Sequence, residues 1–125
     1  MSNLLRIELS GLPPSVNRMY RTGRSGTRYK RSEVSDWQEE TAGKIWEAWN
    51  KEAYSGNVEV HIVLTVKGNR RWDIDNRLKA LLDCLEIAGV IKDDSQICGI
   101  VAYKERGEKD AVELVMMEHT EIYRK

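Results

Sequence analysis

The most constraining feature of the chain is residues 58–67, where an apolar side chain occupies every second position. The regular apolar positions are Val58, Val60, Ile62, Leu64 and Val66. Successive side chains of a β-strand point to opposite faces, so this period of two predicts a strand that buries one face. His61 falls on the other face, where a lone histidine is more often structural than a ligand.

Weaker patterns before this strand predict a second strand and a helix. Residues 5–9 alternate in the same way. Ser35 and Gln38 have the spacing of a capping box, which predicts a helix from Ser35 to about Tyr54. Tryptophans on an acidic helix are more often core or subunit interface than base-stacking groups. We therefore expect this helix to pack against the sheet.

The second half of the chain predicts another helix and two more strands. Apolar residues at helical spacing follow Asp75, and Gly89 is a natural stop. Residues 97–103 and 112–116 are typical of strands, with a hairpin turn at 106–109. The predicted order is β-α-β-α-β-β, in a single small α/β domain of the mixed α+β kind that spans residues 1–125.

The formal net charge is zero, yet the charges are unevenly distributed along the chain. Residues 1–31 hold seven Lys or Arg against one acid, and residues 32–59 hold two against seven. Residues 17–31 place tyrosines among the basic residues and show no periodic pattern. They predict a basic loop that binds phosphates, as one-signed charge and interleaved aromatics favour.

Composition also limits the compartment and the cofactors. No apolar run approaches the length of a membrane span and no signal peptide is recognisable, so we expect a cytoplasmic protein without membrane contact. Cys84 and Cys98 lack a CxxC partner, and we expect two buried, reduced thiols. No P-loop motif is present, so no nucleotide cofactor is expected.

Carboxylates gather at both ends of the second predicted helix, with a lysine between them. Asp73 and Asp75 precede the helix, Lys79 lies one turn inside it, and Asp93 and Asp94 follow it. Oxygen ligands of this kind suit a hard divalent cation, and a lysine beside them suits a phosphate. The pattern therefore indicates a candidate site for phosphoryl chemistry.

Helix geometry refines this site without deciding its role. With Asp75 as the N-cap, Lys79 lies on the same polar face, and Leu78 and Leu82 point away. Asp83, one turn further on, is placed to hold Lys79. A purely structural interpretation explains the pattern equally well. In it, Asp75 simply caps the helix, Lys79 forms a surface pair with Asp83, and residues 93–94 form a turn.

Two motifs together resemble a known family. The segment GLPPSVNRMYR is similar to a Pro-Pro-Ser-x-Asn-x-x-Tyr motif, and DIDNRLKALLDCLEIAGVIKDDSQI is similar to an Asp-x-Asp-Asn…Lys…Asp-x-Leu…Gly…Asp-Asp…Gln signature. Both belong to the RusA family of Holliday junction resolvases, small endonucleases common on phages and prophages. The resemblance runs over nearly the whole chain and rests on several spaced residues in the correct order.

The resemblance implies a function and a set of site residues. It implies a homodimer that requires Mg²⁺ or Mn²⁺ and resolves four-way DNA junctions in recombination and repair by paired phosphodiester hydrolysis. Its metal-binding carboxylates fall on Asp73, Asp75 and Asp94, and its catalytic lysine on Lys79, while Asp93 is a less certain participant. With the basic loop as a DNA contact, the expected DNA-binding residues are Asn17, Arg18, Tyr20, Arg21, Arg24, Arg28, Arg70 and Arg71.

Two alternatives remain open from the sequence. One is a metal-dependent nuclease that prefers other branched DNA, such as flaps or replication forks. The other is a non-catalytic module for DNA binding or dimerisation, whose acidic residues are structural. Cleavage of a four-way junction with and without magnesium distinguishes an enzyme from such a module.

Overall fold

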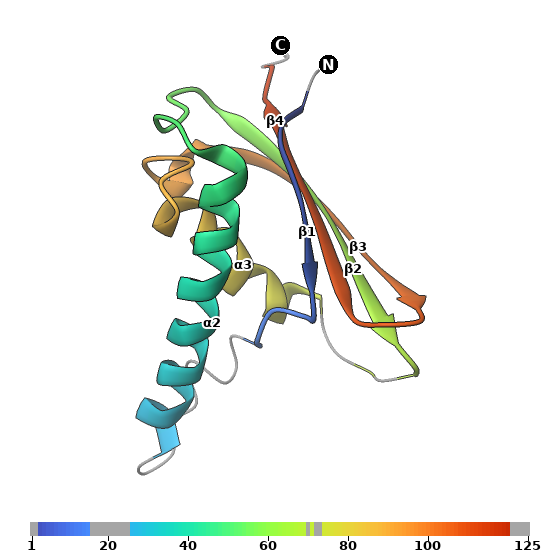
Figure 1. Ribbon diagram of the computed structural model, residues 1–125. Coiled ribbons are helices and arrows are strands. Elements are labelled where there is room, and N and C mark those ends of the chain that lie inside the picture. Colours follow the sequence, from blue (N-terminus) through green and yellow to red (C-terminus); the bar gives the residue numbers. More distant parts are fainter. Residues whose placement is uncertain (1–2, 16–25, 70, 72–73, 121–125) are drawn as a thin grey trace, which may run out of the picture.

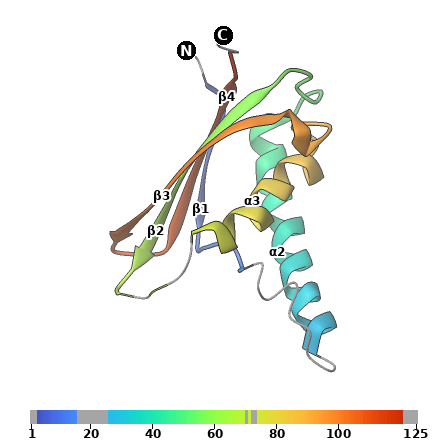
Figure 2. The same ribbon diagram turned by 180° about the vertical axis from the view of Figure 1, so that it is seen from behind.

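The computed structural model describes residues 3–15, 26–69, 71 and 74–120. Along this part of the chain the elements are β1 (Asn3–Ser10), α2 (Gly26–Trp49), β2 (Val58–Lys67), α3 (Asp75–Ile87), the 3-10 helix η1 (Asp94–Gln96), β3 (Ile97–Gly107) and β4 (Ala111–Glu118). The predicted order and the mixed α/β class are confirmed. Both helices lie on one side of the sheet, as Figures 1 and 2 show from opposite directions. Among the described residues, no helix is both long enough and apolar enough to cross a membrane.

The four strands form one sheet in the order β1-β4-β2-β3. β2 runs parallel to β3 and antiparallel to β4, and β4 runs antiparallel to β1. The predicted hairpin between the last two strands is therefore wrong, because β2 lies between them. Parallel neighbours need a crossover connection, and α3 provides it between β2 and β3. This crossover leads the chain from the end of α3 through η1 into β3.

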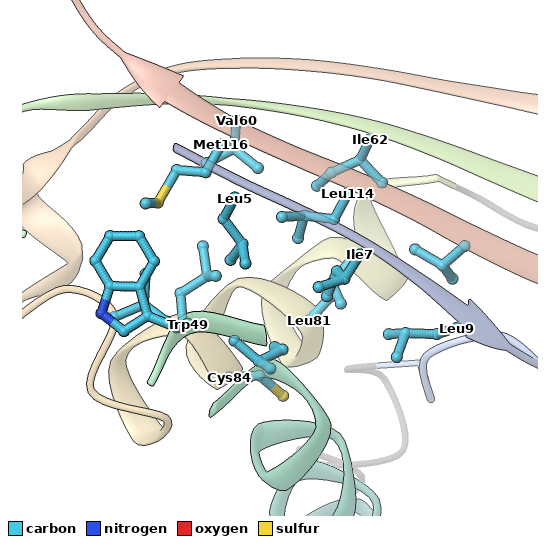
Figure 3. Close-up of a cluster of buried hydrophobic side chains, with 14 of the residues drawn as sticks. Leu5, Ile7, Leu9, Trp49, Val60, Ile62, Leu81, Cys84, Leu114 and Met116 are labelled. Atoms are coloured by element: carbon cyan, nitrogen blue, oxygen red, sulfur yellow. The ribbon is translucent and has the colours of Figure 1, made fainter. Parts of the chain in front are cut away.

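The core lies between the sheet and the two helices, and Figure 3 shows its centre. All five alternating apolar residues of β2 are buried, as their spacing predicts. α3 contributes Leu81, Cys84 and Leu85, each fully buried, and Trp49 closes the core at the end of α2. Full burial of one large aliphatic side chain is worth roughly 1.5–3 kcal/mol. These contacts hold α3, and with it the candidate site, firmly on the sheet.

The first helix differs from its predicted bounds at both ends. α2 begins at Gly26, well before Ser35, and ends at Trp49, before Tyr54. Gln38 does not complete a capping box, because its Nε2 donates to the Ala80 carbonyl of α3 at 3.1 Å. Residues 26–31, which were expected to belong to the basic loop, are therefore helical.

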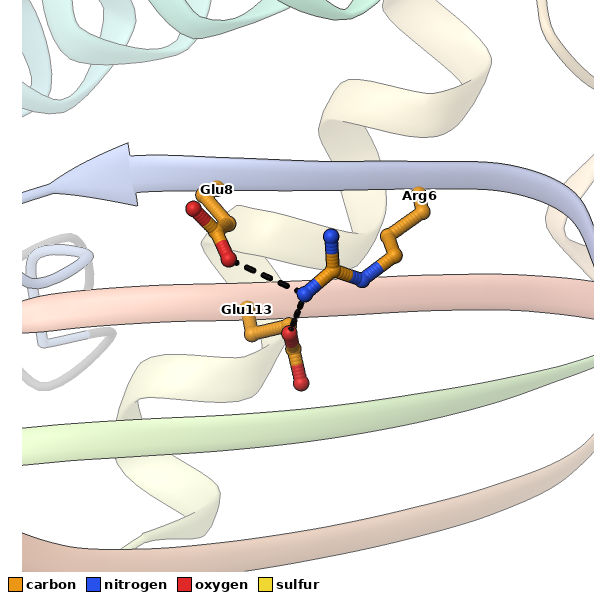
Figure 4. A network of polar contacts seen from close by, with 3 residues as sticks. All are labelled: Arg6, Glu8 and Glu113. Atoms are coloured by element: carbon orange, nitrogen blue, oxygen red, sulfur yellow. Dashed lines mark hydrogen bonds and ion pairs between the residues drawn. The ribbon is translucent and has the colours of Figure 1, made fainter.

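The sheet face opposite the helices carries polar side chains. Nη2 of Arg6 lies 3.0 Å from Oε1 of Glu8 and also contacts the carboxylate of Glu113 on β4 (Figure 4). Glu113, followed by Glu8, raises the pKa of Arg6 above its usual value. Cys98 is exposed, so the expectation of two buried thiols is correct only for Cys84.

Candidate active site

A cleft of about 370 Å³ lies between α3 and the segment formed by η1 and β3. It is lined by Asp75, Leu78, Lys79, Leu82, Asp83, Asp94, Ile97 and Ile100. The cleft thus brings together residues from the start of α3 and from η1, which are far apart in sequence. It contains Asp75, Lys79 and Asp94 of the predicted catalytic set, while Asp73 lies outside the described residues.

A larger hollow of about 560 Å³ lies elsewhere, and Glu8, Glu105 and Glu113 contribute to its lining. Among the described residues, Lys109 is the one basic residue that lines it. A negatively charged concavity repels phosphates, so this hollow is a poor candidate for nucleic-acid chemistry despite its size. The smaller cleft on α3 is therefore the better candidate.

Asp75 is the first residue of α3 rather than its N-cap. Ile74 occupies the cap position with helical angles of φ −64° and ψ −41°, and no side chain caps this end. Asp75 therefore does not have the capping role that one of the open interpretations gave it. A carboxylate in the first turn is still favoured by the helix dipole. From this first turn the Asp75 carboxylate lines the cleft.

Leu78 and Leu82 line the cleft instead of pointing away from it, which corrects the expectation from helix phase. Both are half-buried, because one side of each packs against the core while the other side borders the cleft. Apolar walls keep water from part of the site and strengthen charge interactions within it. The leucines therefore support the polar site as well as the fold.

Lys79 and Asp83 form the pair that their four-residue spacing predicts. Nζ of Lys79 lies 3.7 Å from Oδ1 of Asp83, with 49% and 30% of the two side chains exposed. A pair this open to solvent is worth little stability, typically about 0–1 kcal/mol. Its main effect is on position, because it restrains the lysine beside the cleft.

The two later aspartates have different surroundings. Asp93 is the N-cap of η1 and forms a capping box with Gln96. Its Oδ2 also accepts a hydrogen bond from the Ser95 hydroxyl. Asp94, by contrast, lines the cleft. In this arrangement the Asp93 carboxylate stabilises the turn.

Glu86 is a residue near the site that sequence reasoning missed. It lies in the last turn of α3, and its Oε1 accepts a hydrogen bond from the Asp94 amide at 3.0 Å. Carboxylate oxygens of Glu86, Asp93 and Asp94 lie within 4.8 Å of one another, and all three side chains are exposed. The sequence carries no signal for this meeting, because it depends on how residues 88–93 fold back.

The donor set fits a hard divalent cation. Every candidate ligand atom is a carboxylate oxygen, the type preferred by Mg²⁺ and Mn²⁺. Asp94 belongs both to the acidic group at the end of α3 and to the cleft that holds Asp75. No imidazole or thiolate lines the cleft among the described residues, so its chemistry does not favour zinc or copper.

Comparison with known proteins decides the family. A family model described as Endodeoxyribonuclease RusA matches residues 11–117. The chain belongs to the RusA family. The crossover junction endodeoxyribonuclease RusA of Aquifex aeolicus is 31% identical over 110 residues, which cover 86% of this chain and 87% of the relative. The protein of the same name from Enterobacteria phage HK97 is 32% identical over 85 residues, covering 67% and 69% of the two chains.

The RusA match includes both motifs on which the resemblance rests, and the structure links the two. Nη1 of Arg77, in the first turns of α3, donates to the carbonyl of Pro13 at 2.6 Å. Pro13 belongs to the Pro-Pro-Ser segment that follows β1. The described part of the N-terminal motif, residues 11–15, is therefore held beside the helix that carries Asp75 and Lys79.

Two of the expected DNA-binding residues belong to the described part of the chain. Arg71 is exposed between β2 and α3, and Arg28 falls within the first turns of α2. The expected contacts that lie outside the described residues are Asn17, Arg18, Tyr20, Arg21, Arg24 and Arg70.

Proposed function

We propose that this RusA-family protein is an endodeoxyribonuclease that cuts four-way DNA junctions by paired phosphodiester hydrolysis. The observation that carries the proposal is the cleft shared by Asp75, Lys79 and Asp94. Two acids and one ammonium group in a partly apolar cleft can hold a cation and a phosphate together. The names of both relatives support a crossover junction as the substrate.

The cation of this proposal is Mg²⁺ or Mn²⁺, held by Asp75 and Asp94 together with Asp73. When bound, such a cation polarises the phosphoryl group and lowers the pKa of an attacking water. Asp75 and Asp94 keep the cleft negative enough to attract it. They approach from different elements, so the fold, and not a local motif, sets their separation.

Lys79 supplies positive charge to the phosphate in the same cleft. An ammonium group is a compact point charge, suited to stabilise charge that develops on a phosphate oxygen or the leaving oxygen. Asp83 restrains its position through the 3.7 Å pair. Leu78 and Leu82 limit water beside it, which strengthens the attraction.

We also propose that residues 1–125 form one endonuclease unit that acts as a homodimer in the cytoplasm. A junction with two-fold symmetry requires two cuts, and a two-fold dimer provides two sites in register. The basic residues of 17–31, with Arg70 and Arg71, are proposed to contact the DNA backbone.

The test is cleavage of a synthetic four-way junction with and without Mg²⁺. Asp73→Asn, Asp75→Asn and Asp94→Asn should each lower the cleavage rate by roughly 10²-fold or more, because each removes a charged oxygen ligand. Junction binding without metal should survive in all three. Asp36→Asn, an equal change at an exposed site on α2, is the matched control and should cut normally.

Each alternative predicts a different outcome of this experiment. Wild-type protein that binds junctions but cuts nothing, with or without Mg²⁺, would identify a non-catalytic module. Faster cleavage of flaps or forks than of four-way junctions would identify a nuclease of another preference. Normal rates in any of the three Asn variants would remove that residue from the catalytic set.

A further inference from the structure

Gln96, the last residue of η1, makes four side-chain hydrogen bonds to the backbone. Its Oε1 accepts from the amides of Lys92 at 2.8 Å and Asp93 at 3.2 Å. Its Nε2 donates to the carbonyls of Tyr54 at 2.7 Å and Gly56 at 2.8 Å. A glutamine amide offers two lone pairs on oxygen and two N–H donors. The hydrogen-bonding capacity of Gln96 is therefore fully used.

These four bonds require an amide in one orientation. Two carbonyl partners need donors, and two amide partners need an acceptor, so the oxygen and nitrogen of Gln96 cannot be exchanged. A glutamate at this position would lose both donors. A methionine would keep the length and bulk of the side chain but make none of the four bonds. Substitutions at Gln96 can therefore separate the effect of its side-chain hydrogen bonds from the effect of its packing.

The segment that receives the two donors is itself attached to the core. The Tyr54 amide donates to the Val90 carbonyl at 2.8 Å, and Tyr54 forms an isolated parallel bridge with Ile91. Val90 and Ile91 are fully buried. Gln96 therefore ties the turn of residues 92–96 to a fixed part of the fold.

Asp94 lies within this turn, directly after one of the two amides that Gln96 binds. Its own amide is held from the other side by Glu86, so two side chains fix the backbone on which the Asp94 carboxylate is mounted. Holding the backbone in this way limits the positions that the Asp94 carboxylate can reach, much as outer-shell partners restrain metal ligands.

We infer that Gln96 is a positioning residue for Asp94, and that its amide sets how well the cleft binds a divalent cation. Gln96 does not touch the cation or the DNA in this arrangement; it acts only through the turn. The inference rests on the proposed function, because it takes the cleft to be the cation site.

The experiment compares wild type with Gln96→Met in three measurements on the full chain. The first is amide hydrogen exchange at Lys92 and Asp93, whose N–H groups donate to Gln96. The second is Mn²⁺ binding by calorimetry without DNA, and the third is steady-state junction cleavage. Val112→Ala, which removes buried volume from β4, is the control for general loss of stability.

We expect faster exchange at both amides in Gln96→Met, and Mn²⁺ affinity and kcat each reduced by about 10- to 100-fold. KM for the junction should stay near the wild-type value, because the substitution leaves the proposed backbone contacts of residues 17–31, Arg70 and Arg71 intact. Val112→Ala should lower the melting temperature and leave Mn²⁺ affinity and kcat unchanged. Wild-type Mn²⁺ affinity and kcat in Gln96→Met would overturn the inference.

Two further results show whether a negative outcome comes from misfolding of the variant or from failure of the proposed function. If Gln96→Met does not fold, Gln96→Asn serves instead; its shorter amide cannot reach both sides, so a smaller loss of Mn²⁺ affinity is expected and an unchanged affinity contradicts the inference. If wild type does not cut junctions, the proposed function fails. Exchange and Mn²⁺ affinity then still decide whether Gln96 positions the turn for cation binding.

Discussion

Lys79 illustrates how one residue can satisfy a structural and a chemical interpretation at once. Its pair with Asp83 is the surface contact that a non-catalytic interpretation predicts. The same side chain also lines the cleft with Asp75 and Asp94. Because the exposed pair contributes little stability, the two interpretations differ mainly in what they predict for cleavage.

We predict that Lys79→Met lowers kcat for junction cleavage by about 10²-fold, the usual scale for losing one charge-stabilising group. Asp83→Asn keeps the ammonium group and loses only its restraint, so its effect should be less than about tenfold. Single-turnover cleavage with saturating metal measures both. A normal rate in Lys79→Met would assign the lysine to the surface pair alone.

The two cysteines differ in a way that spacing in the sequence could not predict. Cys84 is fully buried in α3, and burial, with a smaller contribution from the charge of Asp83, raises its pKa to about 12. Cys98 is exposed on β3, an edge strand of the sheet. Only the thiolate reacts readily, so the two thiols should differ strongly in reactivity.

We predict that Ellman's reagent at pH 8 modifies one thiol per native chain and both after denaturation. Cys98→Ser should abolish the reaction of the native protein, and Cys84→Ser should leave it unchanged. Absorbance of the released thiolate provides the count. Rapid reaction of two thiols in the native protein would show that α3 opens far more readily than its packing implies.

At the scale of elements, periodicity predicts that a helix or strand is present better than it predicts where that element ends or which strands pair. The period-two patterns of β1 and β2 identify both strands and their buried faces, because alternation follows directly from strand geometry. The start of α2 was misplaced because it was inferred from a capping box at Ser35 and Gln38. Gln38 bonds instead to Ala80 across the helix pair, a contact that no local pattern encodes. The β3–β4 hairpin was wrong for a similar reason, since strand pairing is decided by tertiary packing.

Glu59 connects the ends of two neighbouring strands. Its Oε1 lies 2.6 Å from Nε2 of His61 on β2, and its Oε2 lies 3.5 Å from Nδ1 of His119, just beyond β4. The hydrogen bond with His61 is the main reason why the pKa of Glu59 is lowered below its ordinary 4.5. A carboxyl with a lowered folded pKa stabilises the fold above its ordinary pKa and loses that contribution as pH falls through the folded value.

We therefore predict that Glu59→Gln lowers the free energy of unfolding near pH 7 and that its difference from wild type shrinks as pH falls below 4.5. Urea unfolding at a series of pH values measures the difference. Glu47→Gln, at an exposed position on α2, is the control. Its difference from wild type in unfolding free energy should be smaller and should change less with pH. A Glu59→Gln difference that stays constant from pH 7 to pH 3 would contradict the linkage.

At the scale of the whole molecule, the candidate site is only partly readable from the sequence. Helix periodicity predicts that Asp75, Lys79 and Asp83 share a face, because residues four apart are neighbours on a helix. That Asp94 joins the same cleft follows from the crossover through α3 and η1 into β3. The hydrogen bonds of Glu86 and Gln96 to the turn that carries Asp94 form only in the folded chain, so spacing in the sequence could not predict them.

The distribution of charged residues also differs between parts of the molecule. The outer sheet face carries Arg6 between two glutamates, whereas α2 begins with basic residues and has no acid in its first turn. Under the proposed function, the basic residues of 17–31 contact the DNA backbone.

We predict that replacing Arg18, Arg21 and Arg24 together by Gln weakens junction binding and flattens its salt dependence. Each lost phosphate contact reduces the slope of log K against log salt by about 0.9, so three contacts reduce it by roughly 2–3. A triple Gln variant at Lys44, Lys51 and Lys109 removes the same net charge elsewhere and should leave the slope nearly unchanged. Fluorescence anisotropy without Mg²⁺ from 50 to 300 mM salt measures both slopes. Equal changes in the two variants would mean that net charge, and not contact by this segment, determines DNA affinity.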